Sequence, residues 1–315
     1  MIKRLKLVAV VGGAAAAGAP IAAAVLLRPG PGVDTSPRPT TASTPLSPTF
    51  PAPPSGATVF SRQLGAKALA LAVVPRRGGR LLLQASVLGP QGKGVAGLSV
   101  SFAVQGVTNA ATPCGPGCYR TTLGTSGRPP SVQLEVRGRA SARWRVALPA
   151  AWPARDAGAL VAEASNAWRS LRSLTFLDRL ASGTRQSTTS TWRIQAPDRV
   201  AYRVKNGWAA IIVGERRWDR PPSGGHWVSS PQTRLTQPRP PWVSVTNAHL
   251  LGPATVQGRA AWRVSFFDPG TPGWFEVMLD RRTKHTLELR MVATAHFMHD
   301  SYSSFNAAPA ITPPR

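Results

Sequence analysis

Hydrophobic and charged residues alternate along residues 191–220, whose sequence is TWRIQAPDRVAYRVKNGWAAIIVGERRWDR. Val200, Tyr202 and Val204 stand at every second position, and basic residues occupy most of the neighbouring positions. A period of two puts alternate side chains on opposite faces of a strand. The pattern therefore predicts a β-strand with one apolar and one charged face.

A turn dipeptide, Asn206-Gly207, follows this strand directly. Both residues tolerate positive φ, which a type I′ hairpin turn requires at its two central positions. The chain is therefore predicted to return antiparallel over residues 208–213 and to turn again at Gly214-Glu215. A third strand then begins at Arg216, which completes an antiparallel meander.

Residues 154–310 continue this pattern and are predicted to form one large antiparallel sheet with a single apolar face. Apolar residues recur at spacings of three and four from Asp156 to Leu174, which predicts a helix with Asp156 as its N-cap. The sheet either packs wholly on this helix or curls and leaves an apolar hollow for a ligand. Further strands are predicted at residues 174–181, 186–195, 262–267, 275–279 and 287–291.

Residues 58–150 show short alternating segments separated by turn residues, without a helical period. This spacing is typical of an immunoglobulin-like β-sandwich. Tryptophan is nearly absent before residue 144 and frequent afterwards, which supports a domain boundary near residues 149–153. The strands expected in this first domain cover residues 69–75, 81–89, 99–105, 131–137 and 142–148.

The N-terminal residues show the pattern of an export signal or a membrane anchor, in which basic residues precede an uncharged segment. Lys3, Arg4 and Lys6 precede an uncharged run over residues 7–27, and Pro20 within that run disfavours cleavage. We therefore expect residues 1–28 to be a signal peptide or, preferably, a single-pass transmembrane anchor. The bulk of the chain is then extracytoplasmic, or secreted if the signal is cleaved, and nucleic acid is not expected as a partner.

A segment rich in Pro, Ser and Thr, residues 29–57, is predicted to be an extended linker. The net charge is +25, from 38 basic and 13 acidic residues, and favours anionic partners such as acidic lipid head groups. The same charge also fits arginines spread over solvated strand faces. Cys114 and Cys118, the only cysteines, close a short Gly/Pro loop that suits a disulfide outside the cytoplasm, or a soft Cu(I) site.

The run VLGPQGKGVAGLSVSF, followed by CGPGCYR, resembles the YtkA-like and, more distantly, CopC-like β-sandwich domains of bacterial copper-resistance proteins. The resemblance covers about a third of the chain and implies an accessory role in copper handling. The His- and Met-rich copper ligands of CopC are missing here, as is a CopD-like membrane domain. The ligands would be Cys114, Cys118, His296, Met298 and His299, although strand alternation puts His299 on the face opposite to His296 and Met298.

The order of helix, strand, TWRIQAPDRVAYRV, NG turn and GERRWDR resembles the LolA-type lipoprotein carriers and the related exported lipid-carrier lipoproteins of mycobacteria. In that superfamily a bent half-barrel sheet holds acyl chains against helices, although the lipid-modified cysteine of the mycobacterial group is absent here. The resemblance implies a cavity over the apolar face, and plain core packing is the alternative. The candidate cavity residues are Val200, Tyr202, Val204, Trp208, Ile212, Trp262, Val264, Phe266, Phe275, Val277, Leu289 and Met291.

Basic residues at strand edges are the candidates for contact with anionic head groups, namely Arg199, Arg203, Arg216 and Arg217. The sequence contains no Gly-rich phosphate loop, nucleophile elbow or zinc-spaced set, so no catalytic residue, cofactor or enzymatic activity is predicted. The favoured function is a membrane-tethered binding protein for a lipid or other hydrophobic ligand. Copper handling, or interaction with another envelope protein without a small ligand, are the alternatives.

Overall fold

The computed structural model describes residues 52–64, 67–89, 93–138, 141–181, 187–293 and 296–314. The predicted anchor at residues 1–28 and most of the predicted linker lie outside the described residues. Within these residues, no helix is both long and apolar enough to span a bilayer. The described chain is mostly β, with open antiparallel sheets and one helix, in agreement with the predicted fold class.

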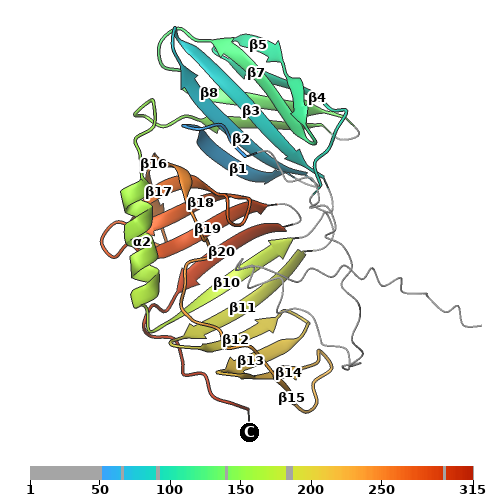
Figure 1. Cartoon of the computed structure of the whole chain (residues 1–315), viewed down its shortest axis with the longest axis vertical. Coiled ribbons are helices and arrows are strands. Elements are labelled where there is room, and N and C mark those ends of the chain that lie inside the picture. Colours follow the sequence, from blue (N-terminus) through green and yellow to red (C-terminus); the bar gives the residue numbers. More distant parts are fainter. Residues whose placement is uncertain are drawn as a thin grey trace, which may run out of the picture.

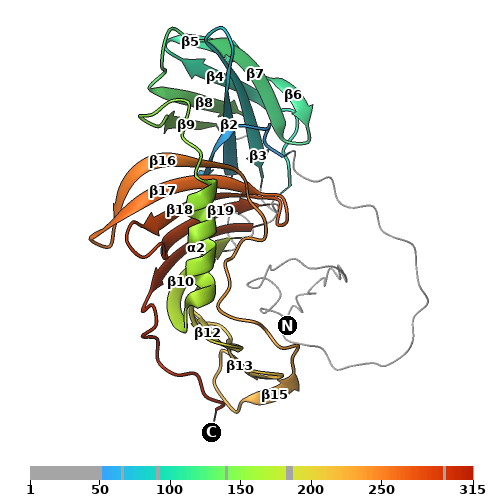
Figure 2. The ribbon, with the colours of Figure 1, turned by 60° about the vertical axis from the view of Figure 1, so that its left-hand side comes forward.

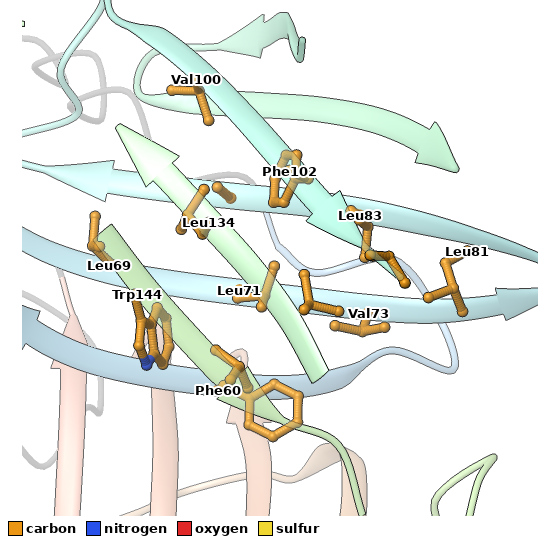
Figure 3. Packing of buried hydrophobic residues seen from close by; sticks show 14 of the residues in the cluster. Phe60, Leu69, Leu71, Val73, Leu81, Leu83, Val100, Phe102, Leu134 and Trp144 are labelled. Atoms are coloured by element: carbon orange, nitrogen blue, oxygen red, sulfur yellow. The ribbon is translucent and has the colours of Figure 1, made fainter. Parts of the chain in front are cut away.

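Strands β1 to β9 form two antiparallel sheets that enclose one hydrophobic core. Inward-pointing side chains such as Leu71, Phe102 and Leu134 interdigitate between the sheets (Figure 3), because alternate residues of each strand face inward. We call this unit the sandwich. One sheet has the order β1 (Thr58–Leu64), β2 (Lys67–Arg76), β3 (Arg80–Leu88), β7 (Cys118–Gly124) and β6 (Thr112–Gly115), and the other β5 (Val107–Ala110), β4 (Ser99–Val104), β8 (Ser131–Arg137) and β9 (Ala142–Ala147).

Strands β10 to β20 form a single antiparallel sheet, which we call the long sheet (Figure 1). The predicted meander of residues 191–220 is confirmed, since β11 to β14 pair in sequence. The strand order is β15 (Val228–Pro231), β14 (Arg216–Arg220), β13 (Ala209–Val213), β12 (Arg199–Val204), β11 (Ser187–Gln195), β10 (Ser173–Ala181), β20 (His296–Ser303), β19 (Thr286–Ala293), β18 (Gly273–Asp280), β17 (Arg259–Asp268) and β16 (Thr246–Val256).

The turn between β12 and β13 differs from the prediction. Asn206 has a φ of 55°, but Gly207 is not in the left-handed region, so the type I′ assignment is wrong. The last paired residues are Arg203 and Ala209, which leaves a longer loop than a two-residue hairpin. A Cβ on residue 207 would lie 2.6 Å from Cγ1 of Val204, so glycine is needed there for space.

The predicted helix is shorter than expected. Helix α2 spans Gly158–Ser170 and packs Val161, Ala164 and Trp168 onto the long sheet (Figure 2). The N-cap is Ala157 and not Asp156, whose carboxylate instead accepts the Gly158 N–H at 3.0 Å. The helix ends where the backbone becomes extended, because the following residues pair into β10.

At one end of β17 to β20 the long sheet is apolar on both faces, so the prediction of a single apolar face is wrong at that end. Phe266 and Phe275 face helix α2, whereas Phe267 and Trp274 face the sandwich. Strand β1 contacts β16, β17, β18 and β19, and the sandwich covers this end of the sheet (Figure 1). The sandwich side of this interface consists mostly of small residues, namely Ala57, Val59, Ala68, Ala70, Ala72 and Val74, with Leu88.

Candidate ligand-binding site

The structure places most candidate cavity residues in the core between the long sheet and helix α2. The predicted residues of β17 to β19 other than Trp262 and Met291 are at most 1% exposed and pack against Val161, Ala164 and Trp168. Trp262 is half-buried, with the guanidinium of Arg281 3.9 Å from its ring centroid. The predicted residues in the core that α2 covers are Val264, Phe266, Phe275, Val277, Leu289 and Met291.

The other half of this face carries a row of aromatic rings. Phe176, Trp192 and Tyr202 come from the adjacent strands β10, β11 and β12. Their ring centroids are 5.6 and 4.5 Å apart, with nearly parallel planes. Val200 and Ile212 complete this cluster, with Val204 partly buried against it. The predicted residue Trp208 is half-buried in the loop before β13.

A segment without regular structure, residues 232–245, closes this face between β15 and β16, and we call it the strap. Leu235 packs against the aromatic row. Trp242 is 3% exposed, lies edge-on to Phe266, and donates its indole N–H to Ser165 of α2 at 2.9 Å. The helix and the strap therefore cover much of this face with the chain's own side chains, which favours core packing over an apolar hollow, the two arrangements that the sequence left open.

A smaller cleft of about 380 Å³ borders the helix and the strap. Ser165, Asn166 and Arg169 form one wall, and residues 242–248 form the other. Its lining is mixed polar and apolar. None of the predicted cavity residues lines it.

The four predicted head-group arginines are not brought together. Arg217 is 8% exposed, holds Asp219 through two hydrogen bonds of 2.7 and 2.6 Å, and donates to the Tyr202 hydroxyl at 2.9 Å. It belongs to the strap-covered face, whereas strand alternation puts Arg199, Arg203 and Arg216 on the other face. Arg199 donates to the Ile311 carbonyl at 2.7 Å.

A second described cleft lies on the opposite face of the long sheet, where the sandwich meets it. Its volume is about 800 Å³, within the range of small-molecule sites. We call it the interface cleft. Strands β1 and β9 form the sandwich wall, and β10 and β17 to β20 form the other. Its lining is mixed polar and apolar. The apolar residues in it are Trp144, Val146, Ala147, Leu180, Ala181, Met291, Val292, Phe297 and Met298. Met291 is the one predicted cavity residue among them, and strand alternation puts its side chain in the helix-covered core together with Leu289.

The sheet wall of the interface cleft contains a buried carboxylate that forms ion pairs with arginines of the neighbouring strands. Glu276 is 4% exposed and accepts two hydrogen bonds of 3.0 Å from Arg263. Arg290 lies 3.9 Å from the same carboxylate. His299 also lines the wall, and burial, together with the positive charges of Arg290 and Arg179, lowers its pKa despite the opposing effect of Glu288. Arginines therefore outnumber acidic residues on the described part of this wall.

A pair of buried carboxyl groups, which sequence reasoning missed, lies within the long sheet. Asp178 and Asp300 are 2% and 1% exposed and are paired across β10 and β20. Tyr302 donates to Asp300 at 2.6 Å, and Ser190 donates to Asp178 at 3.3 Å. Burial raises the pKa of both carboxyl groups, and the charge of Asp178 raises that of Asp300 further.

The proposed metal ligands do not form a site in the described part of the chain. Cys114 and Cys118 are joined in a disulfide, as predicted, and so offer no thiolate. They lie on β6 and β7, on the side of their sheet away from β1. Strand alternation puts Met298 and His299 on opposite faces of β20, and the side chain of His296 lies outside the described residues. The described residues contain no group of three or more His, Cys, Asp and Glu placed for a metal.

No protein-family model and no curated protein matches the sequence. Among solved structures, the chain is similar to the lipoprotein LppX of Mycobacterium tuberculosis, with 12% identity and a TM-score of 0.39 over 49% of this chain and 97% of that one. It is also similar to LprF of Mycobacterium bovis, with 11% identity and a TM-score of 0.36 over 50% of this chain and 95% of that one. A third similar structure is the LolA superfamily protein NE2245 of Nitrosomonas europaea, with 9% identity and a TM-score of 0.23 over 50% of this chain and 96% of that one. At such identities the similarity concerns the fold alone, and a ligand has to be argued from this chain's own residues.

Proposed function

We propose that this protein is a non-enzymatic binding protein for a lipid or another hydrophobic ligand, and that the ligand occupies the interface cleft. The observation that carries the proposal is the ligand-sized volume of that cleft, whose mixed polar and apolar lining includes Ala181, Val292 and Phe297 on the sandwich-facing side of the long sheet. Residues 58–150 and 154–310 would act as two domains that hold the ligand between them. The N-terminal pattern supports an extracytoplasmic, membrane-tethered location.

This proposal moves the ligand to the other face of the long sheet. We assign most of the predicted cavity residues, Met291 among them, to the packing of the helix- and strap-covered face. Each buried methylene contributes about 0.8 kcal/mol, so ten of them gain about 8 kcal/mol. That gain is comparable with the cost of association, which is about 4 to 15 kcal/mol.

Filling the cleft tests the proposal. Ala147 is an exposed residue of β9 that lines the cleft, so Ala147→Trp should block it without disturbing a core. Ala110 is an exposed alanine of β5 at the opposite edge of the same sheet, so Ala110→Trp is a matched control. Each purified protein is extracted with organic solvent, and the extract is analysed by mass spectrometry.

We expect lipid or another apolar molecule from the wild type and from Ala110→Trp, and at least a tenfold smaller amount from Ala147→Trp. The same thermal unfolding midpoint in the two variants would show that both are folded. Equal yields from the two variants would contradict the location of the ligand. An extract from the wild type without any apolar molecule would contradict the proposed function itself.

A further inference from the structure

The charged side chains around the interface cleft restrict the class of ligand further, in an inference that rests on the proposed function. Both walls contribute arginines, whereas the described lining contains one acidic residue, Glu276. The carboxylate of Glu276 is already engaged by Arg263 at 3.0 Å, with Arg290 3.9 Å away. The cleft therefore retains an excess of positive charge. The lining arginines are Arg62, Arg145, Arg179, Arg263 and Arg290.

Three of these arginines have no carboxylate partner among the described residues. Within the described ranges, Arg62, Arg145 and Arg179 form no ion pair, and all three are exposed. Arg145 donates only to the neutral Ser131 hydroxyl, at 3.1 Å. They come from different strands, β1, β9 and β10, and line the same cleft. Like charges that face one opening repel each other, and an anion between them removes that repulsion.

The geometry points to a ligand that carries a phosphate or carboxylate group on an apolar body. The anionic group lies against Arg62, Arg145 and Arg179, because guanidinium groups bind such oxyanions through paired hydrogen bonds. The apolar body covers the lining around Val292 and Phe297, which are 4% exposed. The interface cleft is thus an anionic-amphiphile site, and the two walls have to be present together to form it.

Binding of three simple probes to the full-length protein tests this inference. Dodecyl phosphate and dodecyl maltoside share one alkyl chain, and inorganic phosphate carries the anion alone. Each is titrated calorimetrically below its micelle concentration into the wild type and into the double variant Arg62→Gln/Arg179→Gln. The control variant is Arg77→Gln, an exposed arginine in the β2–β3 turn, at the end of β2 away from the cleft residues of β1.

We expect dodecyl phosphate to bind the wild type and the control about tenfold more tightly than dodecyl maltoside does, and the double variant to lose this preference. If inorganic phosphate binds as tightly as dodecyl phosphate, the cleft is a site for a free anion, and the inference of an amphiphile is overturned. Weaker binding of inorganic phosphate supports an anionic head group attached to an apolar body. Equal affinity of the two amphiphiles for the wild type would overturn the inference and leave the proposed function standing. A preference that persists in the double variant would also overturn it.

Discussion

At the scale of single residues, the unusual feature is the pair Asp178 and Asp300 in the interior of the long sheet. An isolated carboxylate is costly to bury, and two facing carboxylates cannot both ionise without strong repulsion. The Oδ1 atoms of Asp178 and Asp300 receive no hydrogen bond from a donor among the described groups. A proton held between the two side chains satisfies both atoms. We therefore interpret the pair as sharing at least one proton at neutral pH.

This interpretation predicts how stability depends on pH. Burial raises the folded-state pKa of both groups above the unfolded value of about 3.9, so the folded protein binds the shared proton more tightly. The contribution of this proton to the free energy of unfolding is complete below about pH 4. It is lost as the pH rises through the folded-state pKa of the pair. Asp300→Asn should therefore raise the free energy of unfolding at pH 8 by about 1 to 3 kcal/mol, measured by urea denaturation.

The control for this substitution is Asp268→Asn. Asp268 is fully buried but accepts hydrogen bonds from the backbone N–H groups of Val243, Ser244 and Gly270, and from Thr271. Its carboxylate is satisfied in the charged form, so the amide should destabilise the protein. Loss of stability in both variants at pH 8 would contradict a shared proton between Asp178 and Asp300.

At the scale of elements, the turn between β12 and β13 depends on space at Gly207 and not on positive φ. Gly207→Ala would place a Cβ 2.6 Å from Val204, so we expect it to reduce the free energy of unfolding by about 1 to 3 kcal/mol. Gly124→Ala is the control, since Gly124 has negative φ and open space around its Cα. Equal unfolding midpoints for these two variants would contradict the steric explanation.

Predicted strands with a clear alternation of apolar and polar residues, such as β8 and β9, are recovered because each buries one face. Strand β1 was missed because Thr58, Val59, Phe60 and Ser61 are all buried, so no period of two appears. Its two faces are enclosed by the sandwich core and by the long sheet. The alternation of leucine and alanine in β2 could have indicated that this part of the sandwich is buried on both sides. Both faces of β2 are apolar, and one of them carries mainly small residues.

At the scale of the whole molecule, the candidate site depends on contacts that no local pattern contains. The interface cleft needs β1 and β9 of the sandwich beside β10 and β17 to β20 of the long sheet. The sequence predicted the apolar strands correctly. It did not predict which part of the chain packs on each face of the long sheet. The helix and the strap cover most of one face and leave a small cleft at their border, and the sandwich covers part of the other and leaves the interface cleft. The YtkA-like resemblance and the immunoglobulin-like topology of the sandwich stay predictions.

The most direct test of this account is to locate a bound acyl chain. A fatty acid with a photoreactive diazirine is bound to the full-length protein, activated by light, and mapped by peptide mass spectrometry. We predict adducts on the cleft-lining segments 145–147, 290–292 and 297–299. Adducts on α2 and on residues 200–212 that spare these segments would place the ligand under the helix and the strap, and would contradict the interface cleft as the binding site.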